Sequence, residues 1–128
     1  MAEDHSALAR ILPGKWKRLT TSGLQWATKL LRRNQIPIAI CERNLQPGTW
    51  KDFLEQTARM PHSPLLIVTS RLADERLWAE VLNLGGWDVL TKPFDRTEVL
   101  RVVEGAFRHW RNHRELPAGP PQLASRWA

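Results

Sequence analysis

Apolar residues along the chain follow two alternating periods. Short apolar runs rich in branched side chains indicate β-strands buried on both faces, whereas apolar residues at helical spacing indicate amphipathic helices. The expected strands lie at 36–41, 65–69 and 87–91, with WKRLTT at 16–21 as a further short candidate. The expected helices lie at 24–33, from 49, at 74–84 and from 95 through Trp110, with a short helical segment around Leu8, Ile11 and Leu12. This alternation predicts parallel βα units, hence an α/β layer sandwich with helices on both faces of the sheet.

Polar and turn-forming residues mark the ends of these elements. Asp74 begins one expected helix, and Gly85-Gly86 is typical of its C-terminal end. Asp95 and Glu98 resemble a capping box in which Asp replaces the usual Ser or Thr. The last twelve residues, PAGPPQLASRWA, contain three prolines and cannot continue a helix. We therefore expect one domain at 1–115 and a flexible, Pro-rich tail at 116–128.

Composition narrows the class of protein. The chain has 128 residues, of which 42% are hydrophobic, so it can bury a core without disulfides. A single cysteine, no apolar stretch of membrane length and an acidic N-terminus lead us to expect a cytoplasmic protein. The formal net charge is +6, which bears on binding partners rather than on fold. The seven tryptophans follow no stripe, and we expect most of them to pack in the core or at its boundary.

Three polar groups stand where the expected strands end. The first run, IPIAIC, leads into Glu42, the second ends at Thr69-Ser70, and Lys92-Pro93 follow the third. Ligands and chemistry in an open parallel sheet lie beyond the carboxyl ends of the strands. A carboxylate, a hydroxyl and an ammonium group are therefore expected at one edge. Each alone is also an ordinary polar residue at a strand end.

The segments ICERNL, LLIVTS and LTKPF together resemble the receiver domain of bacterial two-component response regulators, the chemotaxis-protein type. The similarity runs from about residue 3 to 113. It implies a flavodoxin-like, doubly wound parallel sheet of order 2-1-3-4-5. It also implies that Glu42 stands at the phosphoacceptor position, Thr69 at the switch hydroxyl and Lys92, with Pro93, at the phosphate-binding lysine.

The sequence departs from the family pattern at functional positions. The acceptor is Glu42 where the family has Asp, and Val89 stands where an aromatic residue often lies. The family's first strand, which ends in the acidic pair that holds Mg²⁺, has no counterpart, and Glu3 with Asp4 are a vestigial candidate for that pair. We expect neither bound Mg²⁺ nor another cofactor. We also expect a sheet without its first strand, prone to self-association at its edge, either because the native start lies upstream or because the chain is a truncated variant.

The resemblance leads to a first functional interpretation. The chain would be a stand-alone atypical (pseudo-)receiver in phosphorelay signalling, in which Glu42 pairs with Lys92 without phosphorylation. A histidine kinase is one conceivable partner. Output would pass to another protein through the surface at 74–110, which this family uses. We expect no DNA-binding or catalytic segment to follow.

A second interpretation is nucleic-acid binding through the C-terminal helix. RHWRNHR, residues 108–114, interleaves basic side chains with a tryptophan, and Lys29, Arg32 and Arg33 add charge. The alternative is a solvated helix end, where cations are favoured by the helix dipole. A third interpretation, catalysis, lacks support: the four histidines are scattered, and Cys41 has no obvious base, so we expect no enzyme.

Overall fold

The computed structural model describes residues 2–14, 19, 23–44 and 49–115, without the side chains of 2–4, 114 and 115. Within this part, helices and strands alternate from residue 24 onward, as the periodicity predicts. In chain order the elements are α1 (Ala2–Ile11), α2 (Leu24–Arg33), β1 (Ile38–Glu42), α3 (Trp50–Thr57), β2 (Leu65–Ser70), α4 (Glu75–Asn83), β3 (Asp88–Thr91) and α5 (Arg96–Glu115).

Side-chain caps fix where several helices begin. Before α3, the Thr49 hydroxyl accepts a hydrogen bond from the Asp52 N–H, and the Asp52 carboxylate accepts one from the Thr49 N–H, which is a complete capping box. The Asp74 carboxylate accepts from the Leu77 N–H at 2.9 Å and begins α4, as predicted. At α5, Asp95 accepts from the Glu98 N–H at 2.9 Å, which is half of the capping box expected there.

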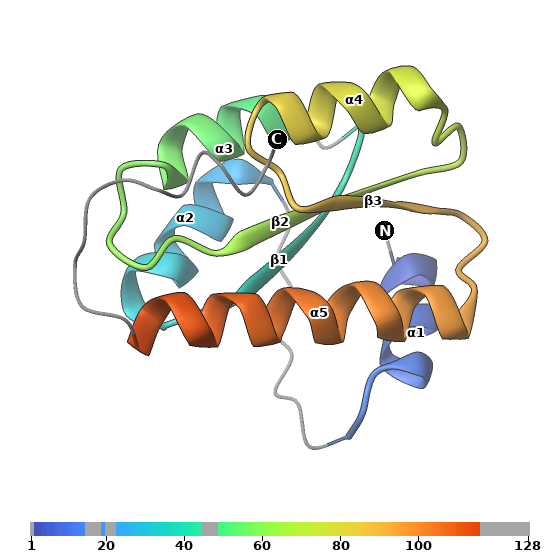
Figure 1. Cartoon of the computed structure of the whole chain (residues 1–128), viewed down its shortest axis with the longest axis horizontal. Helices are drawn as coiled ribbons and strands as arrows, with labels where there is room; N and C mark the ends of the chain where they lie inside the picture. The colour runs from blue at the N-terminus through green and yellow to red at the C-terminus, as the bar shows by residue number, and fades with distance from the viewer. Residues whose placement is uncertain (1, 15–18, 20–22, 45–48, 116–128) are drawn as a thin grey trace.

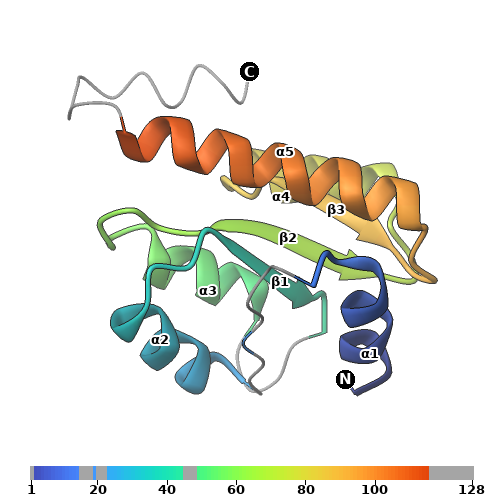
Figure 2. The ribbon, with the colours of Figure 1, turned by 90° about the horizontal axis from the view of Figure 1, so that it is seen from below.

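The described sheet has three parallel strands in the order β1-β2-β3. Because β2 is central, it is almost wholly buried, whereas β1 is mostly half-buried. Alternate residues of the strands enter two separate cores, as a strand period of two requires. One core lies under α2, α3 and α4; the other lies under α5 and α1. Figures 1 and 2 show the resulting layers, with α5 on one side of the sheet and α2 and α3 on the other.

The predicted elements are largely confirmed, with shifted boundaries. The three apolar runs form β1, β2 and β3, and the prediction of helices on both faces is confirmed. The expected short segment at the N-terminus was wrong in length, because α1 spans ten residues. The candidate strand at 16–21 lies outside the described residues, except for Leu19, which is exposed and in no strand. The expected tail at 116–128 also lies outside them.

The tryptophans divide between core and surface. Trp50 and Trp110 are buried, at 3% and 7% exposure, and Trp87 packs against the α5 core. Trp26 and Trp78 are 58% and 51% exposed, so three of the five described tryptophans pack in the core or at its boundary, as expected of most of them. Within the described residues, no helix combines the length and apolar character needed to cross a membrane.

Candidate functional site at the strand ends

The central strand holds its two neighbours at the carboxyl edge of the sheet. Glu42 is in register with Thr69. One residue beyond β1, the Arg43 N–H donates to the Thr69 carbonyl at 2.8 Å. On the other side, the Lys92 N–H donates to the Ser70 carbonyl at 3.0 Å, one residue beyond β3. These backbone bonds fix the positions of Glu42 and Lys92 on either side of the end of β2.

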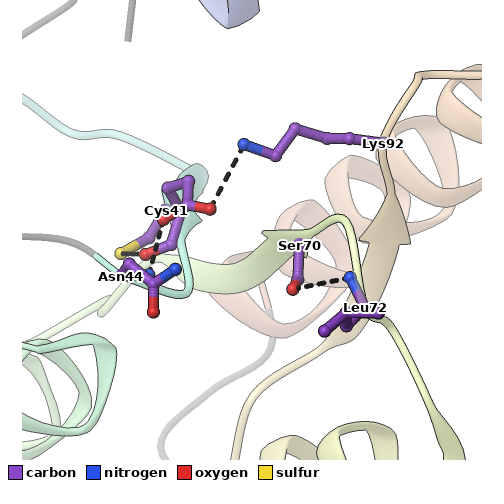
Figure 3. A network of polar contacts seen from close by, with 6 residues as sticks. Cys41, Asn44, Ser70, Leu72 and Lys92 are labelled. Carbon is purple, nitrogen blue, oxygen red and sulfur yellow. Dashed lines mark hydrogen bonds and ion pairs between the residues drawn. The ribbon is translucent and has the colours of Figure 1, made fainter.

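An ion pair joins the two outer strand ends. Lys92 Nζ lies 3.2 Å from Glu42 Oε1, and the side chains are only 9% and 17% exposed. In Figure 3 the Lys92 side chain extends from the end of β3 toward β1, across the end of the central strand. Because both groups are largely removed from water, their attraction is screened less than that of a surface pair. The pair therefore couples β1 to β3 directly.

The second carboxylate oxygen of Glu42 is also engaged. Oε2 accepts a hydrogen bond from the Asn44 N–H at 2.5 Å, in the turn that follows β1. Glu42 thus has a partner at each oxygen, and its orientation is fixed by two different segments. Its charge acts on the preceding residue as well: burial, with a smaller contribution from Glu42, raises the pKa of the Cys41 thiol to about 12. Cys41 is therefore a core residue and a poor nucleophile.

Two hydroxyls lie at the end of the central strand. Thr69 is 2% exposed and lies beside Glu42 in the sheet register. Ser70 is 4% exposed, and its Oγ accepts a hydrogen bond from the Leu72 N–H at 3.1 Å, which stabilises the turn after β2 (Figure 3). The Ser70 hydroxyl is therefore structural, and Thr69 supplies the hydroxyl nearest the carboxylate in the register.

The described residues of this edge offer one carboxylate to a Mg²⁺ ion, that of Glu42. In the described part of the chain, no group of three or more His, Cys, Asp or Glu side chains could share a metal. Glu42 offers one carboxylate, and an ammonium group and an amide already bind its two oxygens. Mg²⁺ demands near-octahedral oxygen ligands. Glu3 and Asp4, the vestigial pair of the sequence, fall in the first turn of α1, and their side chains lie outside the described residues.

The structure thus brings together the residues expected at this edge. Glu42 and Lys92 are in direct contact, Thr69 is next to Glu42 in the register, and Pro93 follows Lys92 through a cis peptide bond. The sequence did not reveal the part played by the Asn44 amide. Backbone donors leave no residue-type signal, although a turn directly after a strand is where such a donor is expected.

The basic C-terminal segment has a different structure from the one expected for nucleic-acid binding. Trp110, the aromatic residue of RHWRNHR, is 7% exposed and packs in the core, so it is not available to stack on a base. Arg108 and Arg111 are exposed, and the Arg111 guanidinium lies 5.9 Å from the centroid of the Phe107 ring. The His109 ring contacts the rings of Trp87 and His113 in tilted arrangements. Aromatic interleaving in this segment therefore serves packing.

Comparison with known proteins identifies the fold. No family model and no curated protein matches the chain in sequence. Solved structures do match. The signal receiver domain of an HD domain-containing protein from Pseudomonas fluorescens Pf-5 is similar with a TM-score of 0.80 and 22% identity, over 91% of this chain and 88% of that one.

Two further structures agree with the first. The beryllofluoride-activated NtrC4 receiver domain dimer has a TM-score of 0.76 and 20% identity, over 86% of this chain and 92% of that one. A putative response regulator from Chloroflexus aurantiacus J-10-fl has a TM-score of 0.72 and 16% identity, over 84% and 88%. The chain therefore has the flavodoxin-like α/β fold of response regulator receiver domains, as the sequence resemblance implied.

Proposed function

We propose that the chain is an atypical receiver module of two-component signalling that acts through protein contacts and without phosphorylation. The observation that carries this proposal is the ion pair between Glu42 and Lys92 at 3.2 Å, at the sheet edge where the resemblance puts phosphoryl chemistry. The fold shared with receiver domains supports the signalling role. The chemistry of the edge supports the atypical character.

The extra methylene of glutamate is central to this reading. Glutamate places its carboxylate about 1–1.5 Å farther from the backbone than aspartate, a displacement large enough to disable a reaction that depends on alignment. With this extension, Glu42 contacts Lys92 across the end of β2. Both oxygens are occupied, so attack on a phosphoryl donor requires breaking the contact with Lys92 or with the Asn44 amide. In this proposal, the unmodified Glu42 carboxylate imitates a phosphorylated aspartate and does not itself accept a phosphoryl group.

A permanent carboxylate of this kind biases a conformational equilibrium. Switch proteins interconvert between two states, and a new charge favours the state that binds it better. Glu42 provides about one negative charge, whereas an aspartyl phosphate carries up to two, so the bias it creates is incomplete. Lys92 would transmit it, because its backbone continues from β3 into the segment that leads to α5.

The output surface in this proposal is formed by α4, β3 and α5, residues 74–110. Lys92 directly follows β3, and this surface includes the exposed ring of Trp78. A partner protein, for which a histidine kinase is one candidate, would bind there. No catalytic step is assigned to the chain.

Incubation with a small phosphodonor and Mg²⁺, followed by intact-mass measurement, tests the proposal. We expect no change in mass for the wild type. A stoichiometric gain of about 80 Da, the mass of one phosphoryl group, located on Glu42 would overturn it. Glu42→Asp is the matched comparison, because it shortens the side chain by one methylene while it keeps the charge.

A further inference from the structure

One face of α2 is basic, aromatic and uncovered by the described part of the chain. Trp26 is 58% exposed, and Lys29, Arg32 and Arg33 are exposed beside it. Lys29 Nζ lies 4.5 Å from the centroid of the Trp26 ring. At about 100° per residue, these four positions lie within about 120° of the helix circumference. The helix sequence LQWATKLLRR contains no acidic residue, so the α2 strip (Trp26, Lys29, Arg32 and Arg33) is uniformly cationic.

The opposite edge of the sheet has a groove of the opposite charge. It has a volume of about 360 Å³ and lies between the first turn of α4, strand β3 and the first turns of α5. The Trp78 ring, 51% exposed, forms part of its wall, and the indole N–H donates to Asp88 at 3.3 Å. The lining of this acidic groove contains four carboxylates and one guanidinium: Asp74, Glu75, Asp88, Glu98 and Arg101. Within the described residues, none of these four carboxylates forms an ion pair with a base.

The strip and the groove cannot meet within one molecule. Helix α2 packs on α3 at the β1 side of the sheet (Figures 1 and 2), whereas the groove is lined by residues of α4, β3 and α5. A contact between them must therefore join two copies, and it uses different surfaces on each. Such a contact is heterologous, or head-to-tail, and it leaves one strip and one groove open at the two ends.

We infer that the α2 strip of one copy docks in the acidic groove of a second copy. Three cationic groups meet four carboxylates, and the exposed rings of Trp26 and Trp78 supply the aromatic area that charged surfaces alone lack. The inference rests on the proposed function in one respect: it names a second copy as an occupant of the α4–β3–α5 face. It does not depend on the state of Glu42.

Association of this kind is expected to be weak and sensitive to salt. Exposed ion pairs contribute little individually and are screened over the Debye length. That length is about 30 Å at 0.01 M salt and about 3 Å at 1 M. Sedimentation velocity of the full chain at these two salt concentrations should show a weight-average mass that rises with protein concentration at low salt. At high salt the mass should return to that of one chain.

Charge-reversal variants test the contribution of each surface to association. Arg32→Glu with Arg33→Glu should lower the association constant at low salt by at least about tenfold, and Glu75→Lys with Glu98→Lys should do the same. An equimolar mixture of the two variants should associate again, because every strip then meets a groove of opposite charge. Restored association also shows that both variants are folded.

Two controls complete the test. The control Arg10→Glu with Arg59→Glu changes exposed positions outside the strip and the groove. It changes the net charge by the same amount as Arg32→Glu with Arg33→Glu and should leave association unchanged. Trp26→Ala, which alters an exposed ring without changing charge, should weaken association several-fold.

The inference is overturned if the wild type remains monomeric at low salt, or if the mixed variants do not associate. It is also overturned if a fluorescent single-stranded oligonucleotide binds the wild type more tightly than Arg32→Glu/Arg33→Glu while self-association is absent. That result would make the strip a nucleic-acid site. Each of these outcomes leaves the phosphodonor experiment unaffected, so failure here is distinguishable from failure of the proposed function.

Discussion

Neutralising either member of the Glu42–Lys92 pair should destabilise the chain, and neutralising both should cost less than the two single changes added together. At 3.2 Å and an effective dielectric of about 20, two unit charges attract by about 5 kcal/mol. Desolvation of the two groups offsets much of this attraction. We therefore expect Glu42→Gln and Lys92→Met each to lower the free energy of unfolding by about 2–4 kcal/mol, because each removes the attraction between two largely buried charges. The coupling energy between them should be about 1–3 kcal/mol.

The chain supplies a matched control for this cycle. Lys51 and Glu80 also approach to 3.2 Å, but their side chains are 51% and 43% exposed. Exposed pairs contribute about 0–1 kcal/mol, so the same cycle at this pair should give a clearly smaller coupling energy. Urea unfolding followed by circular dichroism measures the wild type and the variants of both cycles, provided that the slopes with denaturant agree. Equal coupling energies for the two pairs, or a coupling below about 0.5 kcal/mol for Glu42–Lys92, would refute the reasoning.

Three other predictions concern packing and reactivity. Cys41, whose pKa is raised to about 12, should react with iodoacetamide at pH 8 far more slowly in the native chain than in urea, and equal rates would show that the thiol is accessible. Gly86→Ala should lower the free energy of unfolding by about 1–3 kcal/mol, because the added Cβ would lie 2.5 Å from a valine methyl; Gly14→Ala, with nothing within 4 Å, should cost far less. Trp50→Ala should cost about 3–5 kcal/mol in the same assay, whereas Trp26→Ala should have almost no effect on stability because the ring is exposed.

The sequence predicted the layer architecture because local patterns determine it. The apolar runs that became β1, β2 and β3 are short and branched, and the intervening helices have one apolar face each. Among the helix caps, Asp74 and Asp95 were predicted, but one capping box was missed. The complete capping box at Thr49 has Asp52 at the third position instead of the usual Glu or Gln, and the sequence did not mark it.

The candidate site was predictable in outline, because parallel strands bring their carboxyl ends to the same edge. That rule placed Glu42 and Lys92 near each other. Their pairing was expected from the resemblance and not from this rule, since a 3.2 Å ion pair depends on the register of β1 and β3 against β2 and on the reach of two flexible side chains. The Asn44 amide was invisible for a simpler reason: a backbone donor is common to almost every residue.

The tryptophans show where residue type alone fails. Trp50 and Trp110 are buried, and Trp26 and Trp78 are exposed, although all four lie on helices. Whether a tryptophan is buried or exposed depends on which face of its helix it occupies. Because Trp110 belongs to the core, the basic and aromatic surface of the chain lies on α2 instead of on α5.

The amide NMR spectrum of Glu42→Gln, compared with that of the wild type, tests the central claim most directly. The claim is that the Glu42–Lys92 pair holds the α4–β3–α5 face in one conformation without phosphorylation. We predict chemical-shift changes in Glu42→Gln that extend from Lys92 through residues 74–110, and a wild-type spectrum that does not respond to a phosphodonor with Mg²⁺. Shifts confined to the neighbours of residue 42, or a wild-type spectrum that changes on addition of the phosphodonor, would contradict the claim.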